Sequence, residues 1–312
     1  MDDTPAAINP TQLPFIVIAH RGASGERPEH TLEAYRLAIK QGADFIEPDL
    51  VLTKDGVLVS RHDPWLSDST NVADKPEFAD RKRTISTPDG GAITDWWAFD
   101  FTLAELKTLK ARQVREGRSK AYDDQFDIPT FEEIIALAKS ESVRTGRTIG
   151  LYPEAKAPAA HKAMGFDMLG AVVKALKDAG YAGKDAPVYV QCFEPPFLMD
   201  LDKKVDTPLI QLDYADASIH GAPTVPLEHI ATYADGVGIF KHMLFDAKTG
   251  QATDYGARAK ELGLAVHAWT FRDDDLPAFG SAEDEMQAAV DAGATGVFTD
   301  FPATAVAQFK KN

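Results

Sequence analysis

A chain of 312 residues, of which 44% are apolar, is long enough to bury a sizeable core in one large α/β domain or in two smaller ones. Its net charge of −15 argues against nucleic acid or an anionic membrane surface as a partner. No run approaches the ~20 consecutive apolar residues of a membrane-spanning helix, so stable membrane insertion is not expected. Cys192 stands alone, which excludes an intramolecular disulfide and a thiolate metal cluster.

Short apolar runs alternate with amphipathic segments from residue 15 onward, a pattern typical of βαβ units around a parallel sheet. Eight strands and one extra strand are predicted near residues 15–20, 45–51, 57–61, 148–154, 187–192, 208–213, 236–240, 264–269 and 295–299. The helices between them are expected to begin after Thr31, Thr130, Asp167 and Ser281 and to end near Gly42, Gly180, Gly263 and Gly293. Eight strands with exterior helices predict a closed (β/α)8 TIM barrel.

The chain is longer than the ~250 residues of an ordinary barrel, and residues 64–128 break the alternating pattern. This segment has mixed charge and an aromatic cluster of Trp96, Trp97, Phe99 and Phe101. We predict an N-terminal arm over residues 1–14 and a barrel domain over 15–312, with residues 64–128 as a small insertion beside the mouth of the barrel. An open doubly wound sheet is disfavoured because no G-x-G-x-x-G fingerprint follows the first strand.

Polar and titratable side chains recur where the predicted strands finish. They are His20 and Arg21, Glu47 and Asp49, His62 and Asp63, Glu154 and Lys156, Gln191, and Trp269. In a parallel barrel the carboxyl ends of all strands face one mouth, which is where barrel enzymes keep their active sites. A packed core would favour apolar side chains at these positions, so their joint occurrence indicates a functional site.

The three acids predict a site for a hard cation. Glu47 and Asp49 are two residues apart on an extended segment and point to one side, while Glu154 approaches from the neighbouring strand. Oxygen ligands without a thiol suit Ca²⁺ or Mg²⁺ rather than zinc. His20 and His62 then form a candidate acid/base pair, and Arg21 and Lys156 supply positive charge for a phosphate ester.

Each of these residues also has a structural interpretation. A histidine at a strand end is often only hydrogen-bonded, and Lys156 could simply pair with Glu154. Trp269 could serve packing, and Gln191 could satisfy backbone groups within the barrel. Taken together, the set favours a phosphate-ester site.

Ordered motifs along nearly the whole chain resemble the glycerophosphodiester phosphodiesterase family, and most of all its bacterial periplasmic branch. The motifs are His20-Arg21-Gly22-Ala23-Ser24-Gly25, Pro28-Glu29-His30-Thr31, Glu47-Pro48-Asp49-Leu50, His62-Asp63, Tyr152-Pro153-Glu154-Ala155-Lys156, Tyr189-Val190-Gln191-Cys192-Phe193 and Gly296-Val297-Phe298-Thr299-Asp300-Phe301-Pro302. Pro48 between the paired acids and Pro153 before the third acid depart from the commonest family pattern. Pro48 predicts a locally irregular strand.

The resemblance implies a TIM barrel that hydrolyses glycerophosphodiesters to sn-glycerol 3-phosphate and an alcohol, and it favours attack by the adjacent glycerol hydroxyl through a cyclic phosphate. It implies that His20 and His62 are the acid/base pair, that Glu47, Asp49 and Glu154 bind one divalent cation, Ca²⁺ before Mg²⁺, and that Arg21 and Lys156 hold phosphate. Gln191 and Trp269 complete the substrate-binding set. Residues 1–5 show no signal-peptide pattern, so a periplasmic or secreted location is expected from the resemblance alone.

Two other functions are kept open. A phospholipase-type phosphodiesterase on the same barrel would need an apolar entry rim, for which the aromatic cluster of residues 96–101 is the candidate. A non-catalytic glycerophosphodiester-binding protein would be expected to lack a histidine or an acid of the set, all of which are present. We expect broad tolerance for choline, ethanolamine and glycerol as leaving alcohols, and the sequence leaves a homodimer open.

Overall fold

The computed structural model describes residues 9–86, 91–214, 225–275 and 279–310. Within them, one sheet contains eleven strands in the order β4-β3-β8-β9-β10-β11-β12-β13-β1-β2-β7. The strands are β1 (Ile16–His20), β2 (Phe45–Glu47), β3 (Asp49–Leu52), β4 (Leu58–Ser60), β7 (Gly150–Leu151), β8 (Glu154–Ala155), β9 (Val190–Cys192), β10 (Leu209–Asp213), β11 (Gly236–Phe240), β12 (Ala265–Phe271) and β13 (Gly296–Thr299).

The eleven strands correspond to the eight of the predicted (β/α)8 barrel, because two barrel strands are each split in two and β4 is an extra strand. β2 and β3 lie on either side of Pro48, and β7 and β8 lie on either side of Tyr152 and Pro153. β2 pairs with β7 and β3 with β8, so the two ends of the strand order meet. The irregularity expected at Pro48 is therefore present, since proline removes a donor from the ladder.

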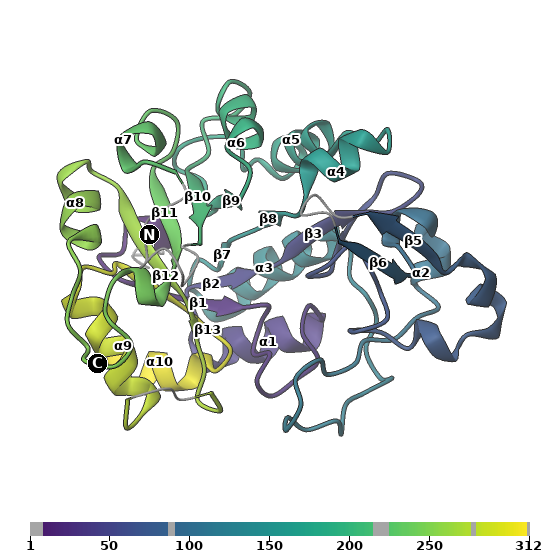
Figure 1. Ribbon diagram of the computed structural model, residues 1–312, viewed down its shortest axis with the longest axis horizontal. Coiled ribbons are helices and arrows are strands. Elements are labelled where there is room, and N and C mark those ends of the chain that lie inside the picture. Colours follow the sequence, from purple (N-terminus) through teal and green to yellow (C-terminus); the bar gives the residue numbers. More distant parts are fainter. Residues whose placement is uncertain (1–8, 87–90, 215–224, 276–278, 311–312) are drawn as a thin grey trace, which may run out of the picture.

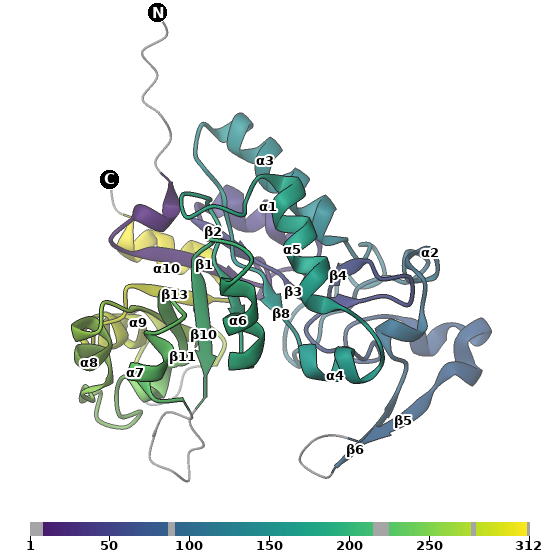
Figure 2. The same ribbon diagram turned by 90° about the horizontal axis from the view of Figure 1, so that it is seen from above.

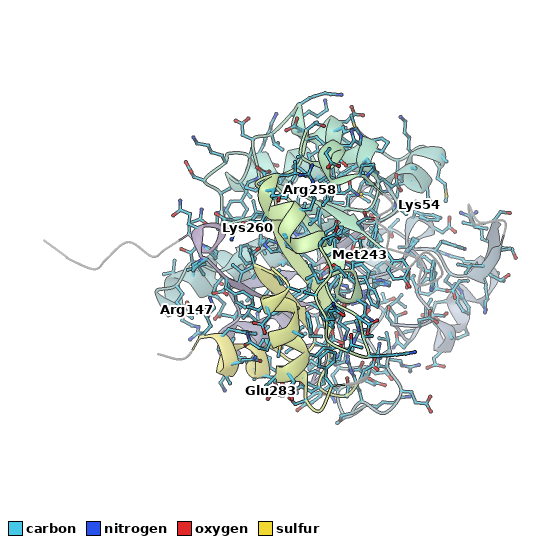
Figure 3. All side chains as sticks on the ribbon, turned by 60° about the vertical axis from the view of Figure 1, so that its left-hand side comes forward. Lys54, Arg147, Met243, Arg258, Lys260 and Glu283 are labelled. Carbon is cyan, nitrogen blue, oxygen red and sulfur yellow. The ribbon has the colours of Figure 1, made fainter. Side chains whose placement is uncertain are left out.

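Helices surround the barrel strands (Figure 1). They are α1 (Leu32–Gln41), α3 (Phe131–Thr145), α4 (Pro158–Ala163), α5 (Met168–Ala179), α6 (Pro195–Asp202), α7 (Leu227–Ile230), α8 (Tyr255–Glu261), α9 (Ala282–Asp291) and α10 (Pro302–Phe309). The predicted N-caps are confirmed, since the side chains of Thr31, Thr130, Asp167 and Ser281 each accept a hydrogen bond from the third backbone N–H of their helix. Figure 3 shows the outer side of the barrel, where Arg258 and Lys260 lie on α8 and Glu283 lies on α9.

Two apolar layers hold the barrel together. The larger layer lies between strands and helices and includes Val17, Tyr35 and Val237. The smaller one fills the barrel interior with Ile16, Ile18, Phe45, Tyr152, Tyr189, Ile210 and Phe298. Interior space is tight, because a Cβ on Gly150 would lie 2.3 Å from the Phe45 ring.

Residues 64–128 form a smaller unit attached to β3 and β4. It contains the antiparallel hairpin of β5 (Arg83–Ser86) and β6 (Ala92–Asp95) and the short helix α2 (Leu103–Leu106), and Figure 2 shows the hairpin pointing away from the barrel. Its core joins Val51 and Val59 to Leu66, Trp96 and Phe101. Trp97 and Phe99 are also buried, so the aromatic cluster is packed inside rather than displayed as a rim.

The proposed division into an arm over residues 1–14 and a domain over 15–312 stays a prediction, and residues 1–8 lie outside the described residues. Among the residues described, none of the helices combines the length and the hydropathy required to cross a bilayer.

Candidate active site

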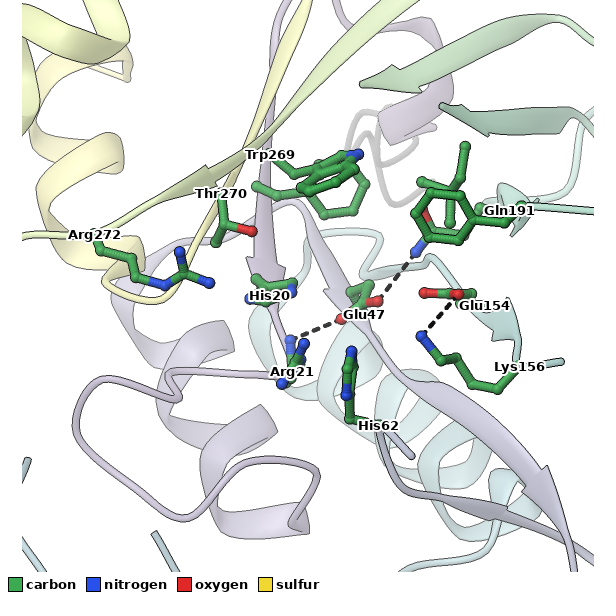
Figure 4. Close-up of a pocket in the computed structure, with 13 residues that line it drawn as sticks. His20, Arg21, Glu47, His62, Glu154, Lys156, Gln191, Trp269, Thr270 and Arg272 are labelled. Carbon is green, nitrogen blue, oxygen red and sulfur yellow. Dashed lines mark hydrogen bonds and ion pairs between the residues drawn. The ribbon is translucent and has the colours of Figure 1, made fainter. Parts of the chain in front are cut away.

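A cavity of about 190 Å³ lies at the mouth of the barrel, where the strands end (Figure 4). Eight of the nine residues predicted from the sequence line it, namely His20, Arg21, Glu47, His62, Glu154, Lys156, Gln191 and Trp269. The other lining residues are Phe193, Leu212, Thr270, Arg272 and Phe298. The ninth predicted residue, Asp49, is buried next to this cavity and belongs to the same acidic cluster as Glu47 and Glu154.

Parallel pairing of the strands brings these residues together. His20 at the end of β1 lies opposite Glu47 of β2, and the backbone N–H of Arg21 donates to Oε2 of Glu47 over 2.8 Å. On the other side, Asp49 lies opposite Glu154, and Glu154 lies opposite Gln191. β2 ends at Glu47 and β3 begins at Asp49, so both acids remain part of the barrel wall although Pro48 interrupts the strand between them.

His62 reaches the pocket by a route that the sequence did not predict. It follows β4, which runs antiparallel to β3 and carries the chain back toward Asp49. The backbone N–H of Arg61 donates to the carbonyl of Asp49, and the fully buried guanidinium of Arg61 donates to the carbonyls of Glu29 and His30. These bonds fix Arg61 and thereby the backbone that leads into His62, although His62 does not end a parallel strand.

Carboxylate oxygens of Glu47, Asp49 and Glu154 lie within 4.8 Å of one another, and all three residues are buried. Gln191 Nε2 donates to Oε1 of Glu47 over 3.0 Å, and Lys156 Nζ lies 2.9 Å from Oε1 of Glu154. Lys156 therefore pairs with Glu154, which was the structural alternative to a role in phosphate binding. Lys156 nevertheless also lines the cavity.

The acidic cluster fits a divalent cation. Burial raises the pKa of Glu47 well above its usual range, and the charges of Asp49 and Glu154 raise it further. Burial likewise raises the pKa of Glu154 to about 8, against the opposing effect of Lys156. Asp49 Oδ1 is buried and has no hydrogen-bond partner among the described residues, so it is available as a ligand.

The charges around the cluster lead to the same conclusion. Arg21 Nη1 pairs with Glu29 over 2.8 Å, and its Nε lies 3.5 Å from Asp49. With Glu29 included, four carboxylates face the two cations Arg21 and Lys156, so ionisation of all four leaves two negative charges that a divalent cation would balance. His30 Nε2 lies 2.9 Å from Oδ2 of Asp49 and would orient that ligand.

His20 and His62 are each hydrogen-bonded through Nδ1 to an aspartate carboxylate. His20 Nδ1 lies 2.6 Å from Oδ1 of Asp300, and His62 Nδ1 lies 2.8 Å from Oδ2 of Asp63. An ionised carboxylate only accepts hydrogen bonds, so each Nδ1 carries the proton and each Nε2 is the free ring nitrogen. Burial and the charge of Arg21 lower the pKa of His20 to about 4, although Asp300 opposes the shift.

Asp300 joins three segments of the chain at the edge of the site. Besides His20, it accepts from Arg118 Nη2 over 2.6 Å and from Arg272 Nε over 2.8 Å. It is 2% exposed, and His20 and the two guanidinium groups together hold its pKa well below the usual range despite burial. Arg118 comes from the inserted segment, which is thereby tied to the barrel mouth.

An aromatic wall forms the opposite side of the cavity from the charged groups (Figure 4). The ring of Trp269 stacks on Tyr214 at 5.9 Å and 17° and meets Phe193 edge to face at 6.1 Å. Phe193 and Tyr214 are 42% and 48% exposed, so this wall continues from the cavity to the surface.

The sequence model of the glycerophosphoryl diester phosphodiesterase family matches residues 20–304. The chain belongs to this family. A glycerophosphodiester phosphodiesterase of Haemophilus influenzae is 35% identical, covering 93% of this chain and 88% of the relative, and one of Arabidopsis thaliana is also 35% identical, covering 91% and 83%. The protein is accordingly a glycerophosphodiester phosphodiesterase, which is a phosphoric diester hydrolase.

Solved structures of the family share the fold. A phosphodiesterase from Oleispira antarctica, in complex with the product sn-glycerol-3-phosphate, matches with a TM-score of 0.67 and 25% identity, over 95% of this chain and 97% of its own. A structure from Silicibacter pomeroyi, described as a putative glycerophosphoryl diester phosphodiesterase, matches with a TM-score of 0.67 at 21% identity, over 96% of this chain and 91% of its own. The TIM barrel predicted from the sequence is therefore that of known phosphodiesterases.

Several residues that line or support the phosphodiesterase pocket were not predicted as site residues. Asp300 lies in a motif that carried the resemblance and directly follows the predicted strand 295–299, so the strand-end rule could have found it. Arg272 was missed because β12 continues to Phe271, beyond the predicted end at residue 269. Arg118 carries no local signal, because only the folded chain brings it to Asp300.

Proposed function

We propose that this phosphodiesterase hydrolyses glycerophosphodiesters such as glycerophosphocholine and glycerophosphoethanolamine to sn-glycerol 3-phosphate and an alcohol. One observation carries the proposal: two histidines, each bonded through Nδ1 to a carboxylate, line a cavity that borders a buried cluster of three acids. The Oleispira antarctica relative holds the product sn-glycerol-3-phosphate, which supports a glycerol phosphate ligand.

Glu47, Asp49 and Glu154 would hold a divalent cation, with Ca²⁺ proposed before Mg²⁺ because oxygen ligands in short, irregular strand pieces suit a flexible coordination shell. When bound, the cation would supply Lewis-acid compensation of the phosphate charge. Arg21, Lys156 and Arg272 line the same cavity and would bind the remaining phosphate oxygens. Trp269 would pack against the carbon side of the glycerol, with Gln191 holding Glu47 in place.

His20 would act as the general base. A pKa lowered to about 4 leaves its imidazole neutral at pH 7, and the Nδ1–H bond to Asp300 leaves Nε2 free to accept a proton. His62 is more exposed, with 34% of its side chain accessible, and in its imidazolium form it would donate the Nε2 proton to the departing alcohol. We propose that the proton taken by His20 comes from the adjacent glycerol hydroxyl, whose attack on phosphorus forms a cyclic phosphate that water then opens. When water opens the cyclic phosphate, His62 would take the proton of the water and His20 would give its proton back to the glycerol oxygen, which restores both histidines.

The test is release of sn-glycerol 3-phosphate from glycerophosphocholine by the purified protein. It is run as isolated, after chelation, and after Ca²⁺ and Mg²⁺ are added back separately. We expect activity to disappear with chelator and to return with Ca²⁺. Full activity after chelation would refute the cation requirement, and no release under any condition by a folded protein would refute the proposed substrates.

A periplasmic or secreted location stays a prediction that rests on the family resemblance, and fractionation of the producing cell tests it. Dimer formation also stays a prediction, and sedimentation of the purified protein tests it.

A further inference from the structure

A second cavity, of about 260 Å³, adjoins the active site. The two cavities share Arg21 and His62, so a ligand whose phosphate meets these two residues can extend from one cavity into the other. The second cavity opens toward the inserted segment and is lined there by Trp65, Asp68 and Val114. His62, the proposed proton donor to the leaving group, is part of its lining, whereas Trp269 lines only the first cavity.

The lining of this second cavity contains three carboxylates, of which two are paired with its two basic side chains. Besides Arg21 and His62 it contains the carboxylates of Glu29, Asp63 and Asp68. Glu29 is paired with Arg21, and Asp63 is paired with His62. In the described part of the chain, no Lys, Arg or His side chain forms an ion pair with Asp68, whose carboxylate accepts from Trp65 Nε1 over 2.9 Å.

Trp65 presents a fixed ring to the same cavity. Its N–H is held by Asp68, and its ring meets Trp97 edge to face at 5.9 Å and 78°. Trp97 is buried and donates its own N–H to the carbonyl of Arg83, so it forms a rigid support. An aromatic face beside an uncompensated carboxylate is a suitable environment for an organic ammonium ion.

We propose that this second cavity is the leaving-alcohol subsite, and that Asp68 and Trp65 make the enzyme prefer glycerophosphodiesters whose alcohol carries a cationic amine, such as choline or ethanolamine. The proposal rests on the function proposed above and narrows the broad tolerance expected from the sequence. A neutral alcohol would fit the volume but would gain nothing from the carboxylate. An anionic alcohol would be repelled by Asp68.

The experiment compares kcat/KM for glycerophosphocholine with kcat/KM for glycerophosphoglycerol, whose alcohol is neutral. For the wild-type enzyme we expect a ratio of roughly six in favour of the choline ester, because Asp68 is exposed and Trp65 is partly buried, so that the ion pair and the cation–π contact each contribute less than about 1 kcal/mol. Asp68→Asn should reduce this ratio roughly threefold through KM, and Trp65→Leu should reduce it roughly twofold. Asp80→Asn is the matched control, because Asp80 is an exposed carboxylate of the same segment that does not line the cavity, and it should keep the wild-type ratio.

A wild-type ratio near one, or an Asp68→Asn enzyme with the wild-type ratio, would overturn the proposal. Release of product from neither substrate would instead refute the proposed function. In that case, titration calorimetry with tetramethylammonium still tests the subsite: weaker binding to Asp68→Asn than to wild type supports it, and equal binding overturns it.

Discussion

Replacement of Asp300 by Asn should destabilise the protein and slow its reaction, although the side chain keeps its shape. Asp300 is 2% exposed and accepts from His20, Arg118 and Arg272 at 2.6–2.8 Å. Removal of one partner from a buried ion pair costs about 3–5 kcal/mol, because the remaining charges stay buried. An unfolding entropy of about 2.1 cal/mol/K per residue corresponds to roughly 0.66 kcal/mol/K for 312 residues, so Tm should fall by roughly 5–8 °C.

The same replacement has a pH signature. The pKa of Asp300 is held well below its usual range, so its stabilisation is complete above pH ~4 and is lost as the pH falls through its folded pKa. The Asn variant should therefore lose less stability than wild type below pH 4. Its kcat should fall by about a hundredfold, because Asp300 also fixes the Nδ1–H of His20.

The assay is thermal unfolding at pH 7 and at low pH, together with kcat on glycerophosphocholine. The control is Asp274→Asn, which removes only the partly exposed partner of Arg118, 35% accessible, and should cost less than about 1 kcal/mol. An Asp300→Asn protein as stable and as active as wild type would refute the reasoning, as would equal destabilisation by both variants.

Three other measurements follow from the structure. Ca²⁺ at 100 times its Kd should stabilise the protein by about 2.7 kcal/mol and thereby raise Tm by roughly 4 °C. The Glu154→Gln variant should lose this rise in Tm, whereas the control Glu132→Gln, which replaces an exposed carboxylate outside the cluster, should keep it. Burial lowers the pKa of His267 from 6.5 to about 3, so at pH 5 the His267 imidazole is protonated only in the unfolded chain. The His267→Gln variant should therefore take up about one proton fewer than wild type on unfolding. Calorimetry in buffers of different ionisation enthalpy measures this proton uptake. A substrate analogue with ethylene glycol in place of glycerol lacks the adjacent hydroxyl and should release product at least about a hundredfold more slowly, whereas comparable release would show direct attack by water.

Much of the fold follows from local signals that the sequence displays. Apolar runs interrupted by capping residues located the strands and helices, because a helix start needs an acceptor such as Thr31 or Thr130 for its free N–H groups. Pro48 predicted an irregular strand, because proline cannot donate to a ladder. The antiparallel direction of β4 had no such signal, since the pairing of Leu50 with Ser60 depends on how the chain turns between them.

Some residues of the site could likewise be predicted from local sequence signals, and others could not. Residues that end barrel strands, such as His20 and Glu47, could be predicted because parallel strands present their ends at one edge. Arg118 and Trp65 could not, because they lie in the inserted segment and reach the site only through tertiary contacts. Arg118 holds Asp300 in place, and Trp65 belongs to the proposed alcohol subsite.

The most direct test of the central claim compares His20→Gln and His62→Gln with wild type for two properties at once. The first is the rate of sn-glycerol 3-phosphate release from glycerophosphocholine, and the second is the rise in Tm on addition of Ca²⁺. We expect each variant to lose at least about a hundredfold in turnover while it keeps the stabilisation by Ca²⁺, because neither histidine belongs to the acidic cluster. Near-wild-type turnover by either variant would contradict the assignment of the two histidines as the acid/base pair.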